Sequence, residues 1–190
     1  MSYNFEQFTS DVDGLTRCEK DPQDIVEQVR GLLQQLLAER DWLDEKYRSP
    51  VPGRPYSQYL LYTPSDEAWS VVSFAWPSGS TTPVHDHCTW GVVGVYQGEE
   101  TETTYRTVEG SVATGRVRVV ERGTAVMSPG GITCVVPPDD IHRVSNNDEG
   151  VAVSVHVYGA NIGKHPRHII DATTGEVKDF ISGYDNPLVC

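Results

Sequence analysis

The sequence predicts a mainly β fold, a sandwich or barrel, with helices at its N-terminal end. In the larger part of the chain, short segments rich in Val, Thr, Tyr and Trp alternate with turns rich in Gly, Pro, Asn and Asp. Near the N-terminus, one long segment instead carries apolar residues at helical spacing. We expect one domain over residues 1–190, with a helical part at about 1–50, a β-barrel at about 55–160 and an extension at about 161–190.

The clearest helix is expected over residues 21–47. Asp21 is a suitable N-cap residue, and Pro22 suits the first helical position. One apolar stripe runs along this segment, formed by Ile25, Val26, Val29, Leu32, Leu33, Leu36 and Leu37. We expect the stripe to pack on the outside of a sheet. The alternative is a helix that binds a partner protein.

Short strands are expected after the helical part, separated by turns. They are placed near residues 56–63, 69–76, 90–97, 100–107, 115–121, 124–127, 132–136, 141–145 and 151–158. Such regular spacing favours antiparallel pairing, with no parallel sheet. The tail after Lys164 is expected to be ordered, with a turn at Thr173-Thr174-Gly175.

Charge and cysteine content limit the possible partners and the compartment. The formal net charge of −12 argues against nucleic acid and against anionic membrane surfaces. No run of apolar residues reaches membrane-spanning length, and no signal peptide is expected at the N-terminus. The cysteines, at positions 18, 88, 134 and 190, lack disulfide-framework spacing, so we expect reduced thiols in a cytoplasmic protein. The oligomeric state is left open.

Three histidines suggest a metal centre. His85 and His87 lie two residues apart, and on a strand such residues point to the same side. His142 offers a third imidazole. Three neutral ligands leave the charge of a divalent ion uncompensated and up to three positions open, which favours an anionic, chelating ligand. The alternatives are structural histidines, or a closed zinc site with Cys88 as fourth ligand, although Cys88 is expected to point away from His87.

A second group of polar residues lies on the last predicted strand. Ser154, His156 and Tyr158 alternate with valines and so share one face. Buried polar groups need hydrogen-bond partners. A relay in which Ser154 orients His156, and His156 orients Tyr158, would satisfy them and place a proton donor beside a metal-bound ligand. The alternative is an ordinary strand with a solvated polar face.

The spacing of these residues resembles the two motifs of the cupin superfamily. The first motif, G-x5-HxH-x3,4-E-x6-G, is matched by Gly79, His85, His87 and Gly98, with Gly91 in place of the usual glutamate. The second, G-x5-PxG-x2-H-x3-N, is matched by Gly131, Pro137, His142 and Asn146, with Asp139 in place of the second glycine. This resemblance implies a cupin fold, a double-stranded β-helix or jelly-roll barrel, with the N-terminal α-helices packed outside it.

Together these residues resemble the cysteine dioxygenase family of thiol dioxygenases, from about residue 56 to residue 167. The resemblance implies a mononuclear Fe(II) bound by His85, His87 and His142. It also implies a relay made of Ser154, His156 and Tyr158. The reaction implied is the addition of both atoms of O2 to the sulfur of a small thiol carboxylate, giving a sulfinate.

Two departures from the sequences of the animal enzymes narrow the range of possible substrates. Those enzymes hold the substrate carboxylate with an Arg at the position of Gln58, and they crosslink the relay tyrosine to a Cys at the position of Gly91. Both features resemble the bacterial 3-mercaptopropionate dioxygenase subgroup, where an Arg beyond the relay strand binds the carboxylate. Arg167 matches that placement, so the resemblance implies conversion of 3-mercaptopropionate to 3-sulfinopropionate with Arg167 and Gln58 as binding residues. The alternative for Arg167 is a surface cation.

Other functions remain open at this stage. Within the same family the substrate could be cysteine or mercaptosuccinate. A different cupin with three histidines could act on a carbon substrate such as a diketone, and a non-enzymatic cupin could bind a small acid as a sensor. Arg48 and Arg54 precede the predicted barrel and could add a carboxylate contact, but the sequence does not fix their positions.

Overall fold

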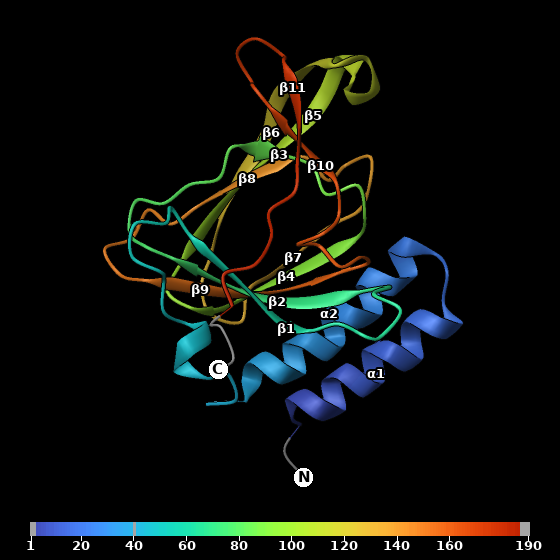
Figure 1. The fold of residues 1–190 in the computed structure, drawn as a ribbon, viewed down its shortest axis with the longest axis vertical. Helices are drawn as coiled ribbons and strands as arrows, with labels where there is room; N and C mark the ends of the chain where they lie inside the picture. The colour runs from blue at the N-terminus through green and yellow to red at the C-terminus, as the bar shows by residue number, and fades with distance from the viewer. Residues whose placement is uncertain (1–2, 40, 187–190) are drawn as a thin grey trace.

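Two N-terminal helices lie against a pair of antiparallel sheets in the computed structural model, which describes residues 3–39 and 41–186 (Figure 1). Helix α1 spans Phe5–Cys18 and α2 spans Pro22–Ala38, followed by a short 3-10 helix, η1, at Glu45–Tyr47. The side chain of Asn4 accepts a hydrogen bond from the backbone of Gln7, and Asp21 does the same for Gln23. Both helices are therefore capped by a short polar side chain at the first turn.

The helical region differs from the prediction in two ways. The helix expected over 21–47 ends at Ala38, and Asp41 beyond it has a φ of 60°, in the left-handed region that an α-helix cannot include. Helix α1 was not predicted as a separate element, although Phe8 and Val12 in it are fully buried one helical turn apart. That spacing was the available sequence evidence for α1.

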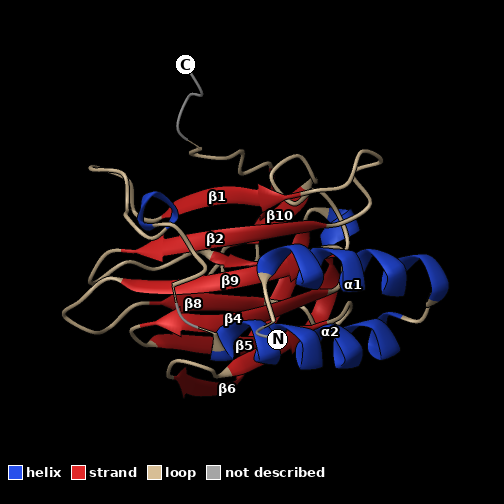
Figure 2. Cartoon of the chain, turned by 90° about the horizontal axis from the view of Figure 1, so that it is seen from below, coloured by secondary structure: helices blue, strands red, loops and turns tan. Residues whose placement is uncertain are grey.

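The first sheet has five strands in the order β1-β2-β9-β4-β7. Their bounds are Ser57–Tyr62 (β1), Ser70–Trp76 (β2), Ala152–Tyr158 (β9), Gly91–Gln97 (β4) and Ile132–Val135 (β7). The helices cover one face of this sheet (Figure 2). Val153, Val155 and Val157 of β9 join the apolar stripe of α2 in one core, as predicted for that stripe. The other face of β9, with Ser154, His156 and Tyr158, points between the sheets.

The second sheet has six strands in the order β11-β10-β3-β8-β5-β6. Their bounds are Val177–Phe180 (β11), Arg167–Ile170 (β10), Val84–His85 (β3), His142–Ser145 (β8), Glu100–Ser111 (β5) and Arg116–Met127 (β6), with a 3-10 turn, η2, at Val112–Thr114. All strand pairings in both sheets are antiparallel. The prediction of a mainly β, antiparallel cupin barrel with helices outside is confirmed.

Several strands differ in detail from the prediction. The strands expected at 115–121 and 124–127 form one long strand, β6, whose pairing with β5 shifts register at Thr104 and Tyr105. A register shift of this kind lets one strand continue through the gap that was expected between the two segments. Strands β3, β10 and β11 were not predicted; they are two to four residues long, and β10 is fixed by pairing with β3 and β11. The predicted turn at residues 173–175 connects β10 to β11, with Gly175 at a φ of 76°.

Among the described residues, none of the helices is both long enough and apolar enough to span a membrane. Cys18, Cys88 and Cys134 are free thiols, while Cys190 lies outside the described residues.

Candidate metal centre

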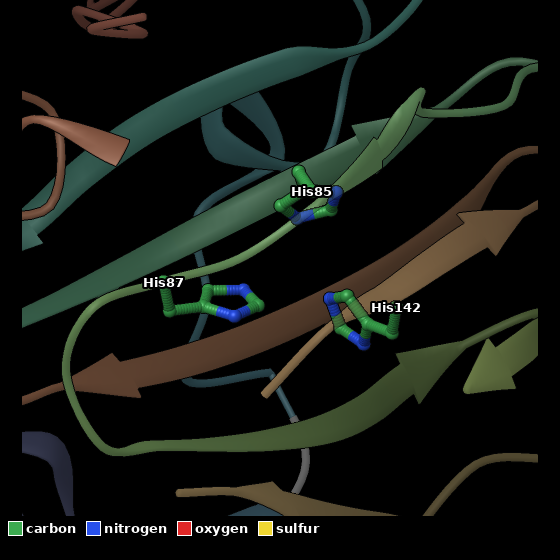
Figure 3. A group of neighbouring side chains, drawn as sticks. All are labelled: His85, His87 and His142. Atoms are coloured by element: carbon green, nitrogen blue, oxygen red, sulfur yellow. The ribbon is translucent and has the colours of Figure 1, made fainter. Parts of the chain in front are cut away.

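The three predicted histidines converge between the two sheets (Figure 3). His85 on β3 is paired in register with His142 on β8, which places the two imidazoles side by side. His87 follows in the loop after β3. The ring centroids lie 4.8 Å apart for His85 and His142, 5.0 Å for His85 and His87, and 4.7 Å for His87 and His142. One ring nitrogen of each lies within 4.8 Å of the other two, so the three could hold one metal ion.

The hydrogen bonds of the rings decide which nitrogen each histidine offers. His85 Nδ1 donates to the carbonyl of Pro83 at 3.0 Å, and His87 Nδ1 donates to the carbonyl of Asp140 at 3.1 Å. His142 Nδ1 contacts Glu102 Oε1 at 2.6 Å. Each Nε2 is therefore left with its lone pair, and that of His87 is buried without any hydrogen-bond partner. Nδ1 bound to an oxygen and Nε2 bound to metal is the usual arrangement of histidine ligands in proteins.

Electrostatics keep two of these rings neutral. Burial lowers the pKa of His85 well below its ordinary value, and the nearby His142 lowers it further. The same two causes lower the pKa of His87. A neutral imidazole has the free lone pair that a metal ion requires, so burial favours the ligating state.

His87 is not oriented by a strand, contrary to the basis of the prediction. Strand β3 ends at His85, and a carboxylate from a distant segment fixes the loop that follows. Asp140 Oδ2 accepts hydrogen bonds from the backbone N–H of His87 at 2.9 Å and of Cys88 at 3.0 Å. Together with the contact from its carbonyl, Asp140 holds both the backbone and the ring of His87.

Glu102 is a residue of the candidate site that the sequence analysis missed. It lies on β5, and its carboxylate contacts both His142 Nδ1 and the hydroxyl of Thr133, which donates at 2.9 Å. Burial raises the pKa of Glu102, but the hydrogen bonds outweigh burial and the net pKa lies below the ordinary value. The carboxylate thus stays charged beside His142, one of the three candidate metal ligands. Its partner lies 40 residues away in sequence, so no local motif indicates the contact.

The three polar residues of β9 form a hydrogen-bonded chain. Ser154 Oγ lies 2.7 Å from His156 Nε2, and His156 Nδ1 lies 2.7 Å from Tyr158 Oη. The indole N–H of Trp76 donates to Ser154 Oγ at 3.0 Å. With that oxygen already accepting, the Ser154 hydroxyl can donate to His156 Nε2. His156 Nδ1–H then donates to Tyr158, which leaves the phenol proton of Tyr158 free to donate to a ligand.

The charge states of this chain follow from its burial. Burial lowers the pKa of His156 well below its ordinary value, with smaller contributions from His142 and Arg167, so the ring is neutral. Burial also raises the pKa of Tyr158, so its phenol keeps the proton. The ring of Tyr158 stacks on that of His87, with centroids 5.4 Å apart and planes 20° apart. This stacking places Tyr158, the last residue of the hydrogen-bonded series, beside the candidate metal centre.

Gly91 lies directly against the relay tyrosine. It is paired in register with Tyr158 across β4 and β9, and a Cβ at position 91 would lie 2.8 Å from two carbons of the phenol ring. Such a distance is shorter than a van der Waals contact between carbons. The absence of a side chain at Gly91 is therefore what allows Tyr158 to occupy its position.

A small cavity of about 40 Å³ opens beside His85, His142 and Tyr158. Gln58 and Arg167 line it, and both are buried, at 4% exposure each. Arg167 Nη2 donates to Ser182 Oγ at 2.7 Å, and the guanidinium lies over the ring of Phe180. Arg167 Nε and Gln58 Nε2 are buried without hydrogen-bond partners. Arg167 is therefore not a surface cation, which excludes that alternative.

The other residues considered from the sequence lie elsewhere. Arg54 pairs with Asp185 at 3.1 Å, Arg48 lies over the ring of Tyr96, and neither lines the cavity. Cys88 is exposed and does not join the three histidines, so the structure does not support a zinc site with Cys88 as their fourth ligand. Its Sγ instead lies near Asp86 and His168.

Solved structures similar to this chain include an acetylacetone dioxygenase from Acinetobacter johnsonii, 14% identical, with a TM-score of 0.46 over 75% of this chain and 84% of that one. A cupin-2 domain protein from Rhodospirillum rubrum is 11% identical, with a TM-score of 0.47 over 65% of this chain and 71% of that one. An oxalate oxidase in complex with the substrate analogue glycolate is 16% identical, with a TM-score of 0.44 over 63% of this chain. This chain spans 59% of the length of that oxidase.

A family comparison covers the region that contains the three histidines and the chain of polar residues on β9. The model of the family described as cysteine dioxygenase type I matches residues 62–166, more than half of the sequence. The matched region includes β2 to β9 and so both halves of the site. With its cupin fold and a three-histidine site suited to a non-haem metal, the chain belongs to the cysteine dioxygenase type I family.

Proposed function

We propose that the protein is a non-haem Fe(II) thiol dioxygenase that adds both atoms of O2 to the sulfur of a small thiol carboxylate to give a sulfinate. The substrate we propose is 3-mercaptopropionate, with 3-sulfinopropionate as product. The residues fit the metal: one ring nitrogen of each histidine lies within 4.8 Å of the other two, and the Nδ1 atoms are held by other groups. When bound there, Fe(II) supplies the redox chemistry with O2 and leaves positions open for a thiolate.

The observation that carries the substrate class is the buried charge of Arg167. Arg167 is 4% exposed, and among the described residues its guanidinium has no salt bridge to a carboxylate. Burial lowers its pKa, yet arginine remains protonated under ordinary conditions. A buried charge without a partner is costly, so an anion is expected beside it. A carboxylate fits, because the planar fork of arginine can grip it with two hydrogen bonds.

The other features of the cavity limit further which ligands could bind. Its small volume suits a molecule of a few heavy atoms, and Gln58 offers a free N–H beside Arg167. Among the described residues that line it there is no aspartate or glutamate, so a substrate ammonium would find no acidic partner. These features favour an unaminated thiol carboxylate, with its carboxylate at Arg167 and its sulfur toward the histidines.

The hydrogen-bonded residues Ser154, His156 and Tyr158 on β9 would provide a hydrogen-bond donor to the bound ligand. Tyr158 keeps its phenol proton and is held in place by His156, which Ser154 and Trp76 orient in turn. We assign to Tyr158 the donation of a hydrogen bond, either to O2 or to the carboxylate of the substrate bound in the cavity. His156 and Ser154 are positioning residues that fix the direction of this bond.

Oxygen uptake and sulfinate formation test the proposal. Iron-loaded protein would be compared with 3-mercaptopropionate, cysteine, mercaptosuccinate and a diketone at equal concentrations. We expect the highest kcat/KM, and one sulfinate per O2 consumed, with 3-mercaptopropionate. Oxygen uptake only with the diketone would overturn the thiol assignment, and binding of small acids without uptake would indicate a sensor. Faster turnover of cysteine would refute the substrate but keep the reaction class.

Replacement of the arginine tests its role separately. Arg167→Gln should raise KM for 3-mercaptopropionate by about 10- to 100-fold, the effect of losing a hydrogen bond between charged groups. Arg54→Gln is the matched control, since Arg54 pairs with Asp185 outside the cavity. An unchanged KM in Arg167→Gln, with normal iron content, would remove Arg167 from substrate binding.

A further inference from the structure

A second cluster of metal-binding side chains lies outside the cavity and plays no part in the proposed reaction. Asp86, Cys88 and His168 each offer one ligand atom, and these atoms lie within 4.8 Å of one another. Asp86 and Cys88 belong to the loop on either side of His87, and His168 comes from β10. Strand β10 reaches the loop by its pairing with β3, in which Ile169 opposes His85.

The two distances from the sulfur are close to those of tetrahedral zinc, whereas the third contact is a hydrogen bond to the other oxygen of the Asp86 carboxylate. With Zn–S of about 2.3 Å and Zn–N or Zn–O of about 2.0 Å, tetrahedral angles place the sulfur about 3.5 Å from each of the other donors. Cys88 Sγ lies 3.5 Å from Asp86 Oδ1 and 3.6 Å from His168 Nδ1. The remaining contact, His168 Nδ1 to Asp86 Oδ2 at 2.7 Å, is a hydrogen bond. It would have to open by roughly 0.5 Å when an ion replaces its proton.

The surroundings of the cluster fit an ion that enters from solvent. Asp86 is 5% exposed and is fixed by the backbone N–H of His168, which donates to Oδ1 at 2.8 Å. Cys88 is exposed, so the fourth position faces water. On the far side of the imidazole, Asp179 Oδ1 lies 3.7 Å from His168 Nε2. The orientation of the ring is set by the hydrogen bond of Nδ1 to Asp86 Oδ2 at 2.7 Å, which keeps Nδ1 on the side of the sulfur.

The backbone of Cys88 is an independent feature of the site. Its φ of 54° lies in the left-handed region, where a side chain costs energy that glycine avoids. The conformation is held by Asp140, which accepts the N–H of Cys88 at 3.0 Å. The thiol therefore occupies a strained position that aims it at Asp86 and His168. This strain also provides a test, because Cys88→Gly removes the thiol while relieving the backbone.

We propose that Asp86, Cys88 and His168 form a second site, for a thiol-binding divalent cation such as Zn²⁺, with one position left to water. The proton of the thiol would leave to solvent as the metal–sulfur bond forms. Because Asp86 and Cys88 flank His87, an ion bound here would also restrain the loop that carries this ligand of the first centre. The site does not depend on the reaction proposed above.

Cobalt provides a test that separates the two centres. The three histidines contain no thiol, so thiolate-to-cobalt charge-transfer absorption in the near ultraviolet reports Co²⁺ bound at a cysteine, and the cysteine variants identify which one. Fe(II)-loaded protein titrated with Co²⁺ without oxygen should develop this absorption, saturate at one Co²⁺ per chain, and lose it when Zn²⁺ is added. Cys88→Gly should abolish the absorption, and His168→Ala should weaken Co²⁺ binding by at least tenfold.

Cys18→Ser serves as the matched control, because Cys18 is an exposed thiol on α1 away from the cluster. It should bind Co²⁺ like the unchanged protein. Folding of each variant is checked by circular dichroism and by retained iron. An absence of thiolate absorption in the unchanged protein, or its persistence in folded Cys88→Gly, would overturn the site.

Discussion

The contact between Glu102 and His142 alters the charge balance of the three-histidine centre. Sequence reasoning expected three neutral ligands and no acidic group, and within residues 3–39 and 41–186 no carboxylate joins the group of three histidines. However, the charged carboxylate of Glu102 lies 2.6 Å from His142 Nδ1 and is held there by Thr133. A buried anion in this position makes the imidazole a stronger donor and offsets part of the metal charge.

Glu102→Gln should therefore weaken metal binding without displacing the ligands. The amide can still contact His142 but carries no charge, so we expect a 10- to 100-fold loss of Fe(II) affinity, as is common for groups behind metal ligands. Competition with a metal indicator under anaerobic conditions measures it. Glu99→Gln, at an exposed position directly before β5, is the control. Equal affinity in both variants would show that the carboxylate charge is irrelevant.

Gly91→Ala should disturb the relay tyrosine specifically. The added Cβ would lie 2.8 Å from the ring of Tyr158, which must move. Because misplacement of a reacting group by about 1 Å can cost about 100-fold, we expect kcat to fall by 10- to 100-fold while iron content stays normal. Gly31→Ala on α2, where a Cβ meets no neighbour within 4 Å, is the control. A normal kcat in Gly91→Ala would mean that the tyrosine position is not critical.

Glu100 is fully buried at the start of β5, and neither of its carboxylate oxygens has a well-formed hydrogen bond. Burial raises its pKa to about 8, although Ser154 and Trp76 lie near enough to lower it somewhat, and Glu102 adds to the rise. The folded protein thus keeps this proton while the unfolded chain loses it near the ordinary value of 4.5. The resulting stability is fully present below that pH and declines as pH rises through the window up to about 8.

Glu100→Gln should flatten this part of the pH dependence. At about 1.4 kcal/mol per unit of pKa shift, the upper limit of the effect is about 5 kcal/mol. Urea unfolding at both ends of the window, in the unchanged protein and in the variant, measures it. The variant should gain stability relative to the unchanged protein as pH rises. A constant difference between the two proteins across the window would show that Glu100 does not titrate there.

At the scale of elements, the packing of α2 against the first sheet contributes to the stability of the fold. Leu33 is fully buried in the core that joins α2 to β9, and a Cβ at Gly94 on β4 would lie 3.0 Å from its side chain. Leu33→Ala should lower the free energy of unfolding by about 2 to 5 kcal/mol, because a cavity would remain between helix and sheet. Urea denaturation measures this. Gln34→Ala, at the neighbouring exposed position, should change stability by at most about 0.5 kcal/mol, and equal losses in the two variants would contradict the packing.

At this scale, the sequence predicted the features that depend on the spacing of residues within a single helix or strand. The stripe of α2 and the alternation on β9 identified both the core face and the chain from Ser154 to Tyr158, because periodicity is a local property. Contacts between distant segments could not be predicted in this way. The partner of His87 is Asp140, 53 residues away, and β10 is four residues long with its position fixed by β3. The position of Arg167 was therefore expected only from resemblance, not from pattern.

At the scale of the whole molecule, the substrate proposed above is an anion that would approach an acidic protein. The formal net charge of −12 repels a thiol carboxylate at a distance, whereas Arg167 attracts it only near the cavity. The distance beyond which salt screens the interaction of two charges falls from about 30 Å at 0.01 M ionic strength to about 8 Å at 0.15 M. Added salt should therefore weaken the distant repulsion more than the attraction of the buried arginine, which water and ions reach poorly.

Raising NaCl from about 0.01 M to about 0.15 M should accordingly increase kcat/KM for 3-mercaptopropionate, by about two- to tenfold. An uncharged thiol such as 2-mercaptoethanol, if it is turned over at all, should show no such rise, which separates screening from any effect of salt on the enzyme itself. Steady-state oxygen uptake at constant pH measures both. A fall in kcat/KM with salt would mean that a positive field around the cavity, rather than the net charge, governs the approach of the substrate.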